Sequence, residues 1–185
     1  TWRDKQLEYS FRRGLMQRYE NFAVVTRNAL DYCCALYGTD LSESQRGELM
    51  AVYGVLPAFA DVEGALSDLS SDDFRKYAFS NGNAAAVEGL LVNAGIREHF
   101  LGAVSVDDLE TFKPNPAVYH HFLKESGAVA DEAWLVSSNP FDVMGAVSIG
   151  MKAAWVQRSD KVVFDPWEIE PTVVIHGLGE LKQVL

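Results

Sequence analysis

The chain has 185 residues, of which 48% are hydrophobic and 23% are charged, so it can bury one sizeable core. Its formal net charge of -10 argues against nucleic acid as a partner, because neutralising phosphates requires clustered lysine and arginine. No apolar run approaches the roughly 20 residues of a membrane-spanning helix, so we expect no membrane partner. Adjacent Cys33 and Cys34 have neither disulfide nor metal-ligand spacing, and we expect reduced thiols in a cytoplasmic protein.

The first 60 residues are predicted to be helical. Apolar residues recur every three or four positions at the start, which is the spacing of one face of an amphipathic helix. These residues are Leu7, Phe11, Leu15, Tyr19 and Phe22. A second helix is predicted over residues 26–37. Ser42 and Gln45 have the spacing of a capping box, which indicates that a third helix begins there.

Beyond residue 60 the pattern changes to alternating strands and helices. Strand-like apolar segments lie at residues 75–80, 102–106, 133–137, 152–156 and 172–176. Helical patterns lie at residues 83–94, 116–125 and 140–149. This alternation is typical of an α/β fold with a Rossmann-like, doubly wound parallel sheet. We therefore predict a helical part over residues 1–60 and an α/β core over residues 61–185.

Polar residues follow three of these predicted strands. Ser80 and Asn81 stand before a helix, where a hydroxyl and backbone N–H groups can bind an anion. The alternative is that S-N-G only makes a turn and that Asn83 caps the helix. Lys113 precedes a proline that keeps it extended, although most loop lysines are simply solvated. Tyr119, one turn into the next helix, is by default a packing residue.

The third cluster is the segment SSNPFD, residues 137–142. Asn139 can cap the following helix, and Asp142 lies in the first turn, where an acid favours the helix dipole. Capping therefore explains these two residues without any function. It does not explain Ser137 and Ser138 at the end of a strand, where ligands bind in open α/β sheets.

The three clusters, in this order at successive strand ends, resemble motifs two, three and four of the haloacid dehalogenase superfamily. Magnesium phosphatases of that superfamily usually carry two acids in the last motif, whereas this chain has only Asp142 there. The segment SSNPFD looks instead like the type II haloacid dehalogenases, also called L-2-haloacid dehalogenases, which need no metal. WRDKQLEY, residues 2–9, is similar to the start of that family's helical cap, and LPAFADVEGAL, residues 56–66, resembles the hinge back to the core. The resemblance implies a cap over residues 1–60, no metal and no cofactor.

The same resemblance implies a set of substrate-binding residues. Arg3 and Asn81, together with the ring edge of Phe141, would hold the departing halide. Ser80 would hold the substrate carboxylate. The residues that would line the pocket around the alkyl group are Leu7 and Phe22.

The resemblance also implies catalytic residues. Lys113 would neutralise and orient a nucleophilic carboxylate, with Tyr119 and Ser137 nearby. Asn139 and Asp142 would position the water and the lysine for hydrolysis. The implied reaction is displacement of halide from C2 of a short L-2-haloacid by an aspartate, followed by hydrolysis of the ester to a D-2-hydroxyacid.

One family motif has no counterpart in this chain. The nucleophilic aspartate of the family lies in a D-x-Y-G-T motif at the end of the first core strand, before the cap. The segment ALYGT at residues 35–39 has Ala35 in that place and falls in a predicted helix. We expect the first core strand and its aspartate in a segment before Thr1.

Two alternatives to a dehalogenase stay open at this point. One is a magnesium-dependent small-molecule phosphatase of the same superfamily. The other is a non-catalytic truncated relative that serves as a binding or dimerisation module. Family members are often dimers, so the resemblance also implies a homodimer.

Overall fold

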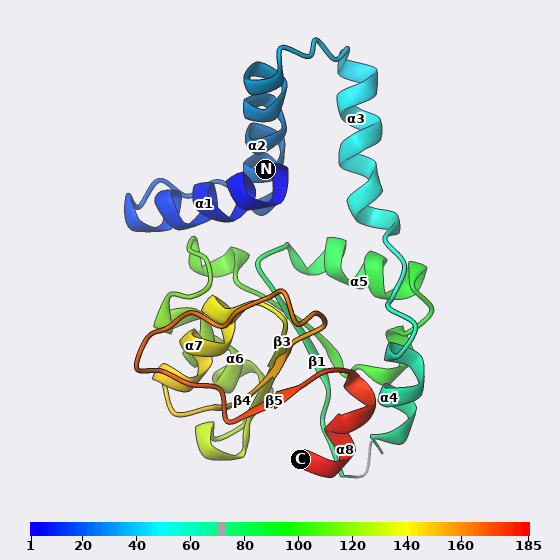
Figure 1. Ribbon diagram of the computed structural model, residues 1–185, viewed down its shortest axis with the longest axis vertical. Coiled ribbons are helices and arrows are strands. Elements are labelled where there is room, and N and C mark those ends of the chain that lie inside the picture. The colour runs from blue at the N-terminus through cyan, green and yellow to red at the C-terminus, as the bar shows by residue number, and fades with distance from the viewer. Residues whose placement is uncertain (70–72) are drawn as a thin grey trace. The chain divides into compact units, whose positions relative to one another are not determined.

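The computed structural model describes residues 1–69 and 73–185, and it contains helices and parallel strands (Figure 1). These residues group by their contacts into two units. The first unit comprises Thr1–Pro57, Ala78–Glu98 and Gly102–Phe112, and the second comprises Ala58–Tyr77, His99–Leu101 and Lys113–Leu185. The predicted boundary at residue 60, between a helical part and an α/β core, stays a prediction. The two units are defined by contacts between residues and are each discontinuous in sequence, so they do not test it. Within the described residues, no helix is both long and apolar enough to cross a membrane.

The first unit begins with three helices. These are α1 (Trp2–Leu15), α2 (Phe22–Tyr37) and α3 (Glu43–Val52), followed by the 3-10 turn η1 (Tyr53–Val55). Helix α2 begins earlier than the predicted residue 26, because the Asn21 side chain accepts a hydrogen bond from the Val24 N–H at 3.0 Å. Gly38, in the left-handed region with φ 61°, ends α2. The predicted capping box is confirmed, because Ser42 and Gln45 exchange both hydrogen bonds at the start of α3.

Helix α1 buries a different face from the apolar one that its sequence shows. Leu15 is 87% exposed, whereas Gln6 and Ser10 are fully buried. The Gln6 amide donates to the Thr26 hydroxyl in α2, and the Trp2 indole donates to the Thr26 carbonyl at 2.9 Å. A buried polar side chain is stable when it has hydrogen-bond partners, and Gln6 obtains its partner from α2. The apolar residues predicted to lie on one helix face do not all belong to one helix, because α1 ends at Leu15 and α2 begins at Phe22.

Two strands and one further helix lie mainly in the first unit, with Tyr77 and His99 at their ends grouped in the second. Strand β1 (Tyr77–Ser80) pairs with β2 (Gly102–Ser105), and α5 (Ala84–Asn93) lies between them in sequence. As the sequence predicted, Asn83 caps α5, because its side chain accepts from the Ala86 N–H at 2.8 Å. The 3-10 turns η2 (Arg97–His99) and η3 (Asp107–Leu109) flank β2.

The second unit is built on a three-stranded sheet. Its strands are β3 (Trp134–Ser137), β4 (Lys152–Val156) and β5 (Val173–Ile175). They lie in the order β3-β4-β5 and are parallel, which confirms the predicted α/β fold. Its helices are α4 (Val62–Asp68), α6 (Pro116–Ser126), α7 (Pro140–Ser148) and α8 (Leu181–Val184), with the 3-10 turns η4 (Ala130–Glu132) and η5 (Leu178–Glu180). Helix α7 packs on β3, β4 and α6.

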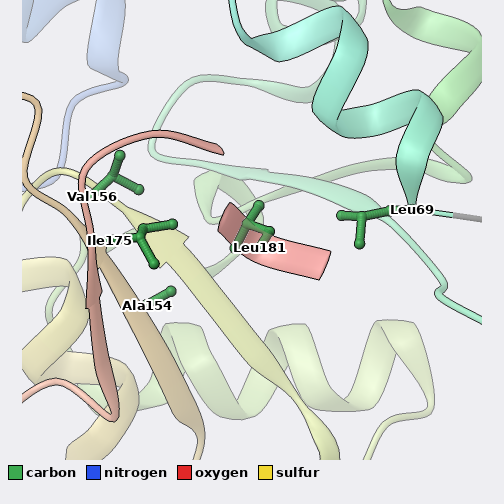
Figure 2. Close-up of a cluster of buried hydrophobic side chains, with 5 residues drawn as sticks. All are labelled: Leu69, Ala154, Val156, Ile175 and Leu181. Atoms are coloured by element: carbon green, nitrogen blue, oxygen red, sulfur yellow. The ribbon is translucent and has the colours of Figure 1, made fainter. Parts of the chain in front are cut away.

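One face of this sheet carries a cluster of buried apolar side chains, shown in Figure 2. Ala154 and Val156 of β4 are two positions apart and therefore point to the same face. Ile175 of β5 pairs with Val156. Leu69, after α4, and Leu181, in α8, complete the cluster. The sheet therefore holds together helices from both ends of the second unit's sequence.

Candidate active site

A buried ion pair lies where the sequence placed two catalytic candidates. Lys113 is 5% exposed and Asp142 is 6% exposed. The Lys113 ammonium donates to Asp142 Oδ2 at 3.0 Å. Lys113 precedes α6, and Asp142 is in the first turn of α7. The packing of these two helices therefore brings together two charges that are 29 residues apart in sequence.

Tyr119 joins this pair through its hydroxyl. The side chain is fully buried, and its hydroxyl lies 3.0 Å from Asp142 Oδ1 and 3.2 Å from the Asp142 backbone carbonyl. Both oxygens of the carboxylate thus have a protein donor, Lys113 on Oδ2 and Tyr119 on Oδ1. Tyr119 is buried as its default interpretation predicted, but its hydroxyl also makes a polar contact that packing alone does not require.

Burial changes the titration of both donors. Burial lowers the pKa of Lys113, because its ammonium has lost water, and the charge of Asp142 acts in the opposite direction. Burial also raises the pKa of Tyr119, and the neighbouring Asp142 charge raises it further. Tyr119 therefore keeps its proton at neutral pH and stays a hydrogen-bond donor to Asp142.

The first turn of α7 contains the remaining residues of the SSNPFD segment. The Asn139 backbone N–H donates to Ser137 Oγ at 3.1 Å, so the serine hydroxyl holds the strand-to-helix turn. Asn139 occupies the N-cap position, but its side chain makes no capping hydrogen bond. The capping interpretation is therefore wrong for the Asn139 amide, and it is the Asn139 backbone carbonyl that accepts, from the Asp142 N–H at 3.1 Å. Phe141 is partly buried beside them.

The first unit holds a second group of candidates, in the turn after β1. Ser80 Oγ accepts from the Gly82 N–H at 3.0 Å, as the turn interpretation expects. The serine hydroxyl still has its own proton to donate. Asn81 is 8% exposed. The Ser105 hydroxyl donates to the Gly82 carbonyl at 2.8 Å, so β2 supports this turn from its other side.

Three further candidates lie on α1 and α2 of the same unit. Arg3 is exposed and donates to Gln6 Oε1, and nearby protein atoms lower the pKa of its guanidinium by desolvation. Leu7 is partly buried. Phe22 is also partly buried, with its ring centroid 6.2 Å from that of Phe112.

Sequence reasoning missed several residues that support the candidates. Gln6 follows Arg3 by three positions, so a helical pattern was enough to pair them. Thr26, which holds Gln6, gave no such signal, because helix packing alone brings it there. Tyr19 donates to Asp107 from 88 residues away, and no local pattern marks that contact.

Comparison with known proteins agrees with the resemblance. The model of the haloacid dehalogenase-like hydrolase family matches residues 4–150. The chain is 36% identical over 184 residues to (S)-2-haloacid dehalogenase 2 of Pseudomonas sp. (strain CBS-3), covering 100% of this chain and 80% of that protein. It is 36% identical over 157 residues to haloacetate dehalogenase H-2 of Moraxella sp. (strain B), covering 85% and 70%.

A solved structure shows the same likeness in three dimensions. L-2-haloacid dehalogenase from Xanthobacter autotrophicus with chloropropionic acid covalently bound superposes with a TM-score of 0.90 and 32% identity, covering 99% of this chain and 83% of that one. These relatives do not favour the phosphatase alternative. The chain belongs to the haloacid dehalogenase-like hydrolases and, within them, to the L-2-haloacid dehalogenases.

Proposed function

We propose that this protein hydrolyses short L-2-haloalkanoic acids to D-2-hydroxyacids through an aspartyl-ester intermediate. The observation that carries the proposal is the buried cluster of Lys113, Asp142 and Tyr119, which has the form of an activating site for a carboxylate. The relatives named (S)-2-haloacid dehalogenases support the choice of substrate. The solved structure with covalently bound chloropropionic acid supports a covalent intermediate.

In the first step, an aspartate oxygen forms a bond to C2 of the haloacid. The carbon–halogen bond breaks, and the halide leaves with the bonding electron pair. Attack on the side opposite the halogen inverts C2. The D-x-Y-G-T motif that carries this aspartate in the family does not occur in the 185 residues, so activity is to be measured on the full-length protein.

Lys113 would hold the nucleophilic aspartate. Its ammonium is desolvated by burial. The pKa of Lys113 stays below its ordinary value even with the Asp142 carboxylate beside it, so this carboxylate offsets only part of the cost of desolvation. A second carboxylate beside the ammonium would therefore stabilise it. Asp142 and Tyr119 would fix the direction in which the ammonium points.

The substrate-binding roles that we propose are those that the family resemblance implies. The free proton of the Ser80 hydroxyl and nearby backbone N–H groups would bind the substrate carboxylate. Arg3 and Asn81, with the ring edge of Phe141, would hold the halide as it gains charge. The alkyl group would lie against Leu7 and Phe22.

In the second step, water hydrolyses the ester. The water oxygen adds to the ester carbonyl carbon, and the acyl–oxygen bond breaks to return the aspartate and release the D-2-hydroxyacid. One water proton ends on the new hydroxyl group and the other passes to solvent. Asn139, whose side chain does not cap α7, would hold the water, with Ser137 supporting the turn and Asp142 retaining Lys113.

We propose that the reaction needs no divalent metal and no organic cofactor. Asp142 is the one acid of the SSNPFD segment, and both of its oxygens already accept from Lys113 and Tyr119. Magnesium is bound through carboxylate oxygens that are turned toward the ion. A carboxylate that is committed to an ammonium and a phenol is a poor ligand of that kind.

The test is halide release by the full-length protein with EDTA present. We expect chloride from L-2-chloropropionate, none from the D enantiomer, and D-lactate as the product. Lys113→Ala should lower kcat by about 100-fold or more, because a preorganised charge is lost. The matched control is Lys124→Ala, which changes an exposed lysine in α6 and should leave the rate unchanged.

Two results would overturn the proposal. Magnesium-dependent hydrolysis of p-nitrophenyl phosphate without halide release would indicate a phosphatase. A folded full-length protein with neither activity would indicate a non-catalytic binding or dimerisation module.

We also propose that the protein is a cytoplasmic homodimer without nucleic-acid or membrane partners. The exposed apolar side chains Leu36 and Tyr37 of α2 and Val52 of α3 support an interface between copies, because large exposed apolar groups commonly mark interaction sites. Light scattering of the full-length protein should give twice the mass of one chain. A cap over residues 1–60 and a core over residues 61–185 remain the proposed domains.

A further inference from the structure

Gly145 lies closer to an aromatic ring than any other residue type could. It is buried in α7, one turn after Asp142. A Cβ atom built on Gly145 would stand 2.2 Å from the Tyr119 hydroxyl oxygen, 2.5 Å from Cζ and 2.6 Å from Cε2. Real Cβ atoms essentially never approach other heavy atoms this closely, so even alanine requires the tyrosine ring to move.

This close approach has a chemical use. Because Gly145 has no side chain, the phenol can lie directly on the backbone of α7. From there its hydroxyl reaches both Asp142 Oδ1 and the Asp142 carbonyl, at 3.0 and 3.2 Å. With Oδ1 held by Tyr119, Oδ2 faces the Lys113 ammonium at 3.0 Å.

The other glycines of the helices do not share this environment. Gly89 in α5 and Gly47 in α3 have nothing within 4 Å of a built Cβ. At those two sites alanine is expected to be tolerated and to favour the helix. The constraint at Gly145 therefore comes from Tyr119 and not from helix geometry.

We propose that Gly145 is a positioning residue, whose missing side chain sets the Tyr119 hydroxyl on Asp142 and thereby fixes the direction of Lys113. The inference rests on the proposed function for its effect on catalysis, but its structural part does not. Gly145 itself touches no substrate. It acts through Tyr119, then Asp142, then Lys113, all within the second unit.

The first test compares Gly145→Ala with Gly89→Ala in the full-length protein. In Gly145→Ala, kcat for L-2-chloropropionate should fall by about 100-fold, because displacing a catalytic group by about 1 Å has effects of that size. KM should change by less than about threefold, because neither Gly145 nor Tyr119 contacts the substrate in the proposed site. Gly89→Ala should keep both constants. An unchanged kcat in folded Gly145→Ala overturns the inference.

A double-mutant cycle shows whether the effect passes through the Tyr119 hydroxyl. Tyr119→Phe alone should lower kcat. Adding Gly145→Ala to Tyr119→Phe should lower kcat no further than about twofold, because the ring that still has to move no longer carries a hydroxyl that holds Asp142. If the two losses multiply, Gly145 acts by another route and the inference is wrong.

If Gly145→Ala does not fold, the pair Tyr119→Leu and Tyr119→Leu/Gly145→Ala replaces it. Removing the ring makes room for a Cβ atom, so both variants should have the same kcat. A further loss in the double variant contradicts the inference.

A crystal structure of Gly145→Ala separates this inference from the proposed function, because it needs no activity. The Tyr119 hydroxyl should lie beyond 3.5 Å, the limit of a hydrogen bond, from Asp142 Oδ1. If the phenol keeps its place, the inference fails even if the protein is a dehalogenase. If wild-type protein releases no halide but the phenol moves, only the proposed function fails.

Discussion

At the scale of single residues, burial gives Lys113 its importance. Most lysines in loops are solvated, and that alternative is wrong here, because Lys113 is almost fully buried against Asp142. Two charges removed from water are stable only when each keeps its partner. Removing one member of the pair that would activate a nucleophile should therefore also lower the free energy of unfolding.

We predict that Lys113→Met abolishes dehalogenation and lowers the free energy of unfolding by about 3–5 kcal/mol, because Asp142 is left buried without its counter-ion. The double variant Lys113→Met/Asp142→Leu should recover most of the stability and none of the activity. Urea unfolding and halide release measure the two effects separately. A single variant as stable as the double would show that the pair is not desolvated in solution.

The sequence nominated both members of this pair, but it did not show that they touch. Tyr119 was also nominated, and its default role as a packing residue accounts for its burial only. Its two contacts with Asp142 follow from how α6 packs on α7. The Gly145 contact was missed, because a glycine within a helical pattern gives no sign of what lies against it.

At the scale of elements, the sheet of the second unit depends on a short C-terminal helix. Leu181 of α8 is 5% exposed and packs with Ile175 and Val156 (Figure 2). The helix has only four residues, so its own hydrogen bonds contribute little and it is held by this apolar contact.

Leu181→Ala should therefore lower the free energy of unfolding by about 2–5 kcal/mol, the usual cost of such a cavity. Gln183→Ala, at an exposed position of the same helix, should change it by less than about 0.5 kcal/mol. Chemical denaturation of both variants checks the difference. A cost below about 1 kcal/mol for Leu181→Ala would mean that α8 is frayed in solution.

Helix limits were predictable where a capping residue was recognised. Ser42 and Asn83 marked the starts of α3 and α5 correctly. Asn21 has the same role at α2, so the predicted start of that helix at residue 26 is wrong. The buried face of α1 was not predictable, because Gln6 is buried only through its partner on α2.

At the scale of the whole molecule, Asp61 joins parts of the chain that are far apart in sequence. Its carboxylate accepts from the Leu178 N–H at 2.8 Å, 117 residues away, and from the Arg158 guanidinium at 3.1 Å. The bond from the Leu178 N–H, with the Arg158 charge, holds the pKa of Asp61 below its ordinary value. All three residues lie in the second unit.

A carboxylate with a lowered pKa in the folded state stabilises that state above its unfolded pKa, about 4, and loses this effect as the pH falls through the folded value. Asp61→Asn should therefore lower the free energy of unfolding by about 1 kcal/mol at pH 7. The difference from wild type should shrink as the pH falls below about 4. Thermal melts across this range, with exposed Asp160→Asn as the control, measure it. A difference that is the same at every pH would contradict the assignment.

The sequence by itself determined the α/β class, the parallel strands, most helix starts and the residue types at the strand ends. These properties are local, because strand and helix periods, caps and short motifs involve neighbours in the chain. Only the tertiary structure decided that Lys113 is buried, that Tyr119 holds Asp142 and that the Asn139 amide does not cap α7. The close approach of Tyr119 to Gly145 was also decided there. Such contacts depend on how elements distant in sequence pack together. A local sequence pattern involves only neighbouring residues, so it cannot predict which distant side chains are buried against each other.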